Sequence, residues 1–227
     1  MKKWKFGFTL GEVLIALGVI GVVASLTLPL IVKGRQATAA QAQFNTAYAL
    51  ITQAITEMET NNVSVNPANY NTARTFFPEF KKFFKTTVEK NYLFQGDYKP
   101  YRYLNNTVCP QDAYQYLDDG RFIINNGMDI FIENKNGNTN GLLIWVDING
   151  NDKNPNTLGF DLFGFEMLNG GELIPVGDPK TTKQDWRNAA SSCKYTEAND
   201  SKRGTGYTCA YFALNEPDYF KKVYHGH

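Results

Sequence analysis

Residues 7–32 of the chain read GFTLGEVLIALGVIGVVASLTLPLIV. Between Phe8 and Val32 the only ionisable side chain is that of Glu12. A helix needs roughly twenty consecutive apolar residues to cross the hydrocarbon core of a bilayer, and this run is long enough to do so. Lysines precede the run at positions 2, 3 and 5, and Lys33 and Arg35 follow it. The sequence therefore predicts a membrane-spanning helix at the start of the chain.

Glu12 is the unusual residue of this run. A carboxylate near the start of a membrane helix costs at least a few kcal/mol unless it has a partner. Cleavage between Gly7 and Phe8 would create an α-amino group one helical turn before Glu12. That amine could neutralise the carboxylate, either in the same chain or in a neighbouring copy.

These residues resemble the cleavage and methylation signal of type IV pilins and type II secretion pseudopilins. The resemblance implies that a prepilin peptidase cleaves after Gly7 and methylates the amino group of Phe8. Glu12 falls on the position whose carboxylate guides docking into a growing filament, and Pro29 on a position where many members carry a helix-kinking proline. Gly11 departs from the pattern, because the family more often has a larger apolar residue there.

The resemblance implies a pilin-like α+β fold in which a long N-terminal helix packs on a small antiparallel sheet. It divides the chain into a leader at residues 1–7, an assembly helix at 8–60 and a globular domain at 61–227. The implied function is that of a structural subunit, polymerising through its helix into a type IV pilus-like or type II secretion filament. Implied partners are other copies or related pilins, the prepilin peptidase, an assembly ATPase and an inner-membrane platform protein.

The implied location is the bacterial inner membrane before assembly, with the N-terminus in the cytoplasm and the globular domain in the periplasm. The leader lysines agree with a cytoplasmic N-terminus. After assembly the domain would belong to a periplasmic or cell-surface filament. A secretory signal peptide fits less well, because its apolar stretch is shorter and ends at a small-residue cleavage site.

Two other functions remain open at this stage. One is a minor or tip pilin that binds a ligand or surface through exposed aromatic residues, for which the candidates are Trp186, Tyr195, Tyr207 and Tyr211. Their clustering is equally consistent with a small core. The other is an uncleaved, membrane-anchored periplasmic binding domain that never polymerises.

Charge and composition argue against nucleic-acid binding and catalysis. The chain has 23 basic and 22 acidic residues; without the leader lysines the balance becomes 20 to 22, about −2. We expect no nucleic-acid partner, because no extended surface of clustered Lys and Arg is indicated. The only histidines, His225 and His227, stand at the C-terminus, so Cys109 lacks an obvious base to activate it. Asp118 and Asp119 are adjacent and read as a turn. We therefore do not expect an enzyme.

Beyond the membrane run, apolar residues recur at three- and four-residue steps, which predicts that the helix continues to about Asn61 with one buried face. Pro29 removes one helical hydrogen bond, which predicts a kink or local melting. Phenylalanines at similar steps predict that residues 70–96 form a helical connection. From Gly120 the pattern changes to short strand-like runs at 121–124, 129–132, 141–146 and 159–165.

Asn-Gly pairs at 126–127, 136–137, 140–141 and 149–150 lie between these runs. Such pairs supply the positive φ angles of hairpin turns. The sequence therefore predicts an antiparallel meander of three to five strands, and a final hairpin near residues 207–214.

Three cysteines in a domain beyond the membrane indicate an oxidising compartment. A Cys193–Cys209 bridge would close a polar loop and resembles the C-terminal disulfide loop of many pilins. It would contribute about 3 kcal/mol in the chain-entropy model. Cys109 is then either a buried thiol or part of a different pairing.

A polar loop at residues 147–161 is the candidate metal site. Asp147, Asn149 and Asn151 place oxygen-bearing side chains at alternate positions, and Asp161 adds a second carboxylate. Hard oxygen ligands suit Ca²⁺. The loop resembles one in pseudopilin-like proteins, whose relatives in type II secretion use calcium. Asp147 and Asp161 would be the charged ligands, with Asn149 and Asn151 supplying neutral oxygens. The alternative is a hairpin in which these side chains cap turns through their own backbone.

Overall fold

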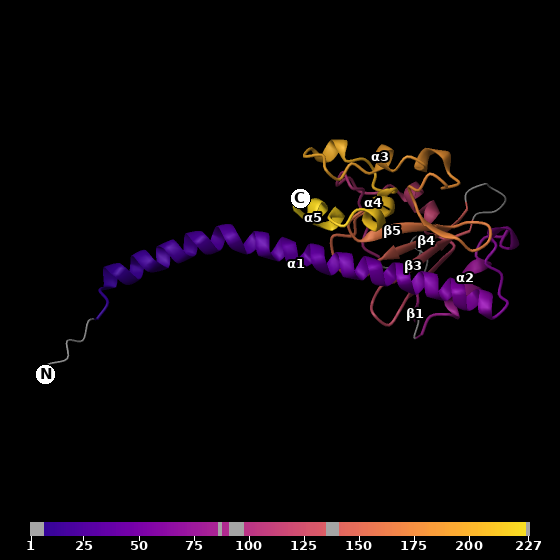
Figure 1. Cartoon of the computed structure of the whole chain (residues 1–227), viewed down its shortest axis with the longest axis horizontal. Helices are drawn as coiled ribbons and strands as arrows, with labels where there is room; N and C mark the ends of the chain where they lie inside the picture. Colours follow the sequence, from indigo (N-terminus) through magenta and orange to yellow (C-terminus); the bar gives the residue numbers. More distant parts are fainter. Residues whose placement is uncertain (1–6, 86–87, 91–97, 135–140, 226–227) are drawn as a thin grey trace.

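The computed structural model describes residues 7–85, 88–90, 98–134 and 141–225. Its longest element is helix α1 (Leu10–Thr60), which has 51 residues. At a rise of 1.5 Å per residue this helix is about 75 Å long. Its first half projects away from the globular domain, whereas its second half lies along the β-sheet (Figure 1).

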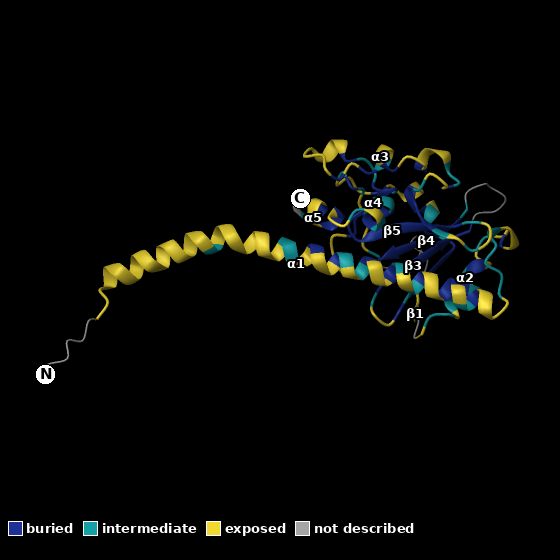
Figure 2. Ribbon diagram, viewed as in Figure 1, coloured by how far each residue is buried: buried dark blue, intermediate teal, exposed yellow. Residues whose placement is uncertain are grey.

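The two halves of α1 have different surroundings. The first half is exposed around almost its whole circumference, and the second half alternates between buried and exposed residues (Figure 2). The buried face consists of Ala37, Ala40, Phe44, Ala47, Ile51, Ala54, Ile55 and Met58. The helix therefore changes from apolar on all sides to amphipathic where it meets the domain, as its sequence pattern predicts.

In the described part of the domain, six antiparallel strands form one sheet in chain order. The strands are β1 (Val88–Glu89), β2 (Gly120–Ile123), β3 (Asp129–Glu133), β4 (Leu142–Asp147), β5 (Leu162–Met167) and β6 (Leu173–Pro175). The α+β fold class, with a long N-terminal helix on an antiparallel sheet, is thus confirmed. Gly127 and Gly150 have the positive φ angles expected of their Asn-Gly pairs. The pairs at 136–137 and 140–141 lie wholly or partly outside the described residues.

Both faces of the sheet are buried, because each has its own apolar cluster. On the α1 side, the ring of Phe44 lies 4.9 Å from that of Phe163 in an edge-to-face arrangement. On the opposite side, Phe131 and Trp145 face each other across β3 and β4 and belong to a second cluster. The central strands therefore show continuous burial instead of the alternation of a half-exposed sheet.

Short helices complete the domain. They are α2 (Phe76–Lys81), α3 (Ala189–Ser192), α4 (Cys209–Asn215) and α5 (Tyr219–His225), with 3-10 turns at Pro67–Asn69, Gln111–Tyr116, Gln184–Trp186 and Asp200–Lys202. Helix α5 lies beside α1 near the point where α1 leaves the domain (Figure 1). The rings of Phe220 and Phe44 are 5.7 Å apart there.

Three expectations about secondary structure were wrong. Among the described residues of the predicted helical connection at 70–96, only α2 is α-helical, and Val88 and Glu89 instead pair with β2. The sheet has six strands, because the two short edge strands β1 and β6 carry little sequence signal. The predicted hairpin at 207–214 is largely helix α4, whose buried residues Cys209, Ala210 and Ala213 recur at helical spacing.

Candidate functional site

The exposed half of α1 is the first candidate site. By length and composition, α1 is the one helix in the described ranges that could cross a membrane. Large apolar side chains that are exposed in this half include Leu14, Leu17, Ile20, Val23, Leu26 and Ile31. The helix continues unbroken through Pro29, so the predicted local melting does not occur, and the ribbon curves only gently (Figure 1).

Glu12 has partners within its own chain. Its carboxylate accepts hydrogen bonds from the backbone N–H and the hydroxyl of Thr9, both at 2.8 Å. The Glu12 N–H in turn donates to Thr9 Oγ1 at 3.2 Å, which completes a capping box at the start of α1. Thr9 was missed, although a Thr followed three residues later by Glu is the signature of this motif. Gly7 and Phe8 are exposed directly before it.

The loop at 147–161 gathers two buried carboxylates. Asp147 ends β4 and accepts hydrogen bonds from the Tyr101 hydroxyl (2.7 Å) and from the Gly150 N–H (2.8 Å). Asp161 precedes β5 and accepts from the backbone N–H groups of Asn156 (2.7 Å) and Thr157 (2.6 Å). The two side chains are 0% and 1% exposed.

Negative charge exceeds positive charge around these carboxylates. Asp129 lies directly opposite Asp147 on the neighbouring strand and pairs with buried Arg121, Nη2 to Oδ2 at 2.6 Å. Neither Asp147 nor Asp161 forms an ion pair with any residue that the structure describes. Burial and the nearby charge of Asp161 raise the pKa of Asp147 well above its ordinary value. Burial raises the pKa of Asp161 to about 7. This pair would be neutralised by either protons or a cation.

The asparagines of the loop differ in whether their side-chain oxygens already accept a hydrogen bond. The Asn151 side chain is fully engaged, because its oxygen accepts from the Lys99 N–H (2.7 Å) and its amide nitrogen donates to the Lys99 carbonyl (2.8 Å). The side-chain oxygens of Asn149 and Asn156 are buried and accept no hydrogen bond from the described part of the chain. Asn156 is therefore a better candidate than Asn151 for a neutral ligand. Sequence reasoning missed it because it breaks the alternate spacing.

A second acidic cluster could hold a metal ion. Carboxylate oxygens of Asp118, Asp119 and Glu133 lie within 4.8 Å of one another. The antiparallel register brings Asp119, just before β2, beside the end of β3, where its N–H donates to the Ile132 carbonyl at 3.0 Å. Arg74 Nε lies 4.0 Å from Asp119 Oδ1 and offsets part of this charge. Sequence spacing alone does not predict the cluster, because Glu133 comes from another strand.

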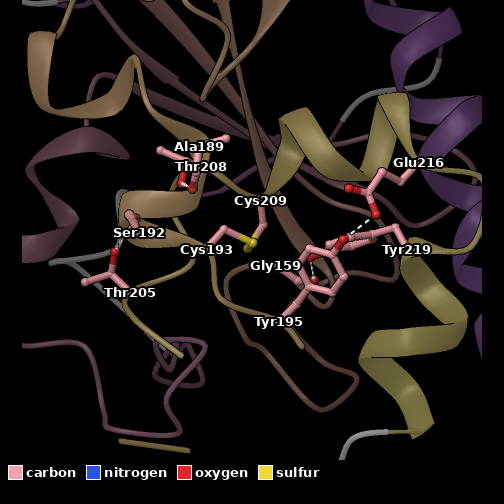
Figure 3. The surroundings of a disulfide bond; sticks show 10 residues. All are labelled: Gly159, Ala189, Ser192, Cys193, Tyr195, Thr205, Thr208, Cys209, Glu216 and Tyr219. Atoms are coloured by element: carbon pink, nitrogen blue, oxygen red, sulfur yellow. Dashed lines mark hydrogen bonds between the residues drawn. A yellow bond between two sulfur atoms is a disulfide. The ribbon is translucent and has the colours of Figure 1, made fainter. Parts of the chain in front are cut away.

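The predicted disulfide between Cys193 and Cys209 is present, with the two Cα atoms 5.1 Å apart (Figure 3). Cys209 is the first residue of α4. Cys109 is a buried free thiol, which settles the alternatives for this residue. Burial raises the pKa of the Cys109 thiol to about 12, so the group is protonated at neutral pH and is a poor nucleophile.

The aromatic residues proposed for a tip-binding surface are mostly internal. Trp186 is 5% exposed and Tyr195 is 7% exposed, which contradicts the expectation that they are exposed. Tyr207 is partly buried and stacks on Trp186, with ring centroids 5.3 Å apart. These side chains, with partly buried Tyr211, belong to the packing of the C-terminal segment and do not form an exposed aromatic surface.

Comparison with known proteins adds no assignment: no family model, no curated protein and no solved structure matches this chain.

The raised pKa of Asp161 predicts a pH-dependent stability. In the presence of a chelator the folded chain retains a proton that the unfolded chain releases above about pH 4. The free energy of unfolding is therefore expected to fall, by on the order of a few kcal/mol, as the pH rises from about 4 through 7. Denaturant titration of the detergent-solubilised chain at several pH values measures this slope. Asp161→Asn is expected to flatten it and exposed Asp152→Asn to leave it unchanged; an unaltered slope in Asp161→Asn contradicts the assignment.

Proposed function

We propose that this chain is a pilin or pseudopilin, a structural subunit that polymerises through α1 into a type IV pilus-like or type II secretion filament. The observation that carries the proposal is the continuity of α1. Its exposed apolar first half continues without a break into the second half, which packs on the sheet. A globular domain alone does not require about 35 Å of exposed apolar helix. Such a helix is useful when lipid covers it before assembly and neighbouring helices cover it afterwards.

In this proposal the prepilin peptidase cleaves between Gly7 and Phe8 and methylates the new amino group. The subunit is held in the inner membrane with its N-terminus cytoplasmic and its domain periplasmic. Before assembly the capping box with Thr9 satisfies Glu12. On assembly Glu12 pairs with the amino group of Phe8 in a neighbouring subunit. An assembly ATPase and an inner-membrane platform protein would drive this exchange.

We further propose that the 147–161 loop binds Ca²⁺. Asp147 and Asp161 would be the charged ligands, and Asn149 and Asn156 would supply neutral oxygens. The donor set fits, because all four groups offer hard oxygen and two of them are buried amide oxygens without hydrogen-bond partners among the described residues. The ion would supply the positive charge that the two buried carboxylates lack. The cluster of Asp118, Asp119 and Glu133 is already partly compensated by Arg74, which makes it the weaker candidate.

Replacement of Glu12 tests assembly. Glu12→Ala is expected to remain processed but to fall at least roughly tenfold in the sheared filament fraction, because the amine of the neighbouring subunit is left without its partner. Quantitative blotting of filament and membrane fractions measures this ratio. Ser25→Ala is the matched control, since among the described residues the Ser25 hydroxyl donates within its own helix, to the Val22 carbonyl. Normal filament levels of Glu12→Ala would refute assembly through this carboxylate.

Thermal unfolding tests calcium binding. Saturation at one hundred times the dissociation constant is expected to stabilise the wild-type chain by about 2.7 kcal/mol. Asp147→Asn removes a buried carboxyl group that needs a proton or a cation for neutralisation, so this variant is expected to be at least as stable as wild type in chelator yet to lose its response to calcium. Asp152→Asn, an exposed change in the same loop, is expected to respond normally. A wild-type melting temperature that calcium leaves unchanged rules out the site.

A further inference from the structure

Gly159 of the 147–161 loop packs against the Cys193–Cys209 disulfide and against helix α5. Gly159 has a φ of +81°, and a Cβ atom added to it would lie 2.7 Å from Cys209 Sγ and 3.2 Å from the Tyr219 hydroxyl. The loop backbone is therefore in direct contact with both groups at this point, and no larger residue fits. Figure 3 shows Gly159 beside the Cys193–Cys209 bond, with the Tyr219 hydroxyl directed at it.

Tyr219 makes a single polar contact with the loop. Its hydroxyl donates to the Gly159 carbonyl at 2.7 Å, and the side chain is 0% exposed. Tyr219 is the first residue of α5, and the next residue, Phe220, packs against Phe44 of α1. The hydrogen bond therefore ties the loop to a helix that is itself fixed on the assembly helix.

Two of the four candidate cation ligands lie on the same short segment of chain as Gly159. Asp161 is two residues beyond Gly159 and Asn156 is three residues before it, and the N–H of Asn156 donates to the Asp161 carboxylate. When both Asp147 and Asp161 are ionised and no cation is present, their repulsion favours opening of this segment. The bond from the Tyr219 hydroxyl to the Gly159 carbonyl opposes this opening.

We propose that Tyr219 is a positioning residue for the cation site, holding the segment at residues 156–161 in its binding conformation when no cation is present. The inference rests on the calcium binding proposed above. The apparent affinity of a site is reduced by the fraction of molecules in which the binding conformation is absent. Loss of the Tyr219 hydroxyl therefore weakens calcium binding even though Tyr219 is not a ligand.

A second tyrosine provides a matched control. Tyr195 lies in the same cluster beside the disulfide, with its ring 4.8 Å from that of Tyr219. Its hydroxyl donates to Glu216 instead of to the loop (Figure 3). Replacing either tyrosine by phenylalanine retains the ring, so the pair of variants compares one hydroxyl that holds the loop with one that does not.

The experiment is calcium titration by calorimetry on the full chain in detergent, with the disulfide intact, for wild type, Tyr219→Phe and Tyr195→Phe. We expect the dissociation constant to rise about 3- to 10-fold in Tyr219→Phe, the equivalent of one buried hydrogen bond, and to change by less than about twofold in Tyr195→Phe. Hydrogen exchange in chelator is expected to be faster at the Asn156 and Thr157 amides in Tyr219→Phe alone.

The possible results distinguish failure of the positioning role of Tyr219 from failure of the calcium site itself. If wild type binds calcium and Tyr219→Phe binds it equally well, with only a lower melting temperature, Tyr219 is an ordinary core residue and the positioning role is overturned. If wild type binds no calcium, the cation site is overturned and the positioning role with it. Equal weakening in both variants would also overturn the role, because it would show a general effect of the cluster.

Discussion

No apolar surface from the described part of the chain covers the first half of α1, and much of the organisation of the molecule follows from this constraint. Apolar surface removed from water contributes about 25 cal/mol per Å², so a long exposed apolar helix favours lipid or other helices as its surroundings. The domain covers only the second half, through Phe44 and its neighbours. The sheet therefore holds one end of the helix and leaves the other available for a membrane or for further subunits.

A different constraint governs the face of the sheet away from α1. The antiparallel register places Asp129 opposite Asp147 beneath a covering segment, and among the described residues Arg121 forms its ion pair with Asp129 and not with Asp147. A fold that encloses uncompensated carboxylates is stabilised by whatever neutralises them, which is why a cation is proposed here. The disulfide and Tyr219 contact the loop at Gly159, and α5, which carries Tyr219, packs against α1. The proposed cation site and the proposed assembly helix thus share one packed C-terminal segment.

The features predicted correctly are those with strong local signals. The length of α1, its change to an amphipathic pattern, the central strands and the Asn-Gly turns at Gly127 and Gly150 are all visible in residue spacing. The failures depend on tertiary contacts. Val88 and Glu89 form a strand only because β2 lies beside them, and the choice of Asn156 over Asn151 depends on where the Lys99 backbone lies. The cluster of Asp118, Asp119 and Glu133 likewise exists only through strand register.

The decisive measurement for the proposed filament subunit is the intact mass of the wild-type protein extracted from membranes, because a subunit of this class must first be processed at its N-terminus. We expect a mass lower by residues 1–7 and higher by one methyl group, with the new N-terminus at Phe8. A full-length, unmethylated chain would contradict it, and would leave a membrane-anchored domain that does not polymerise by this route.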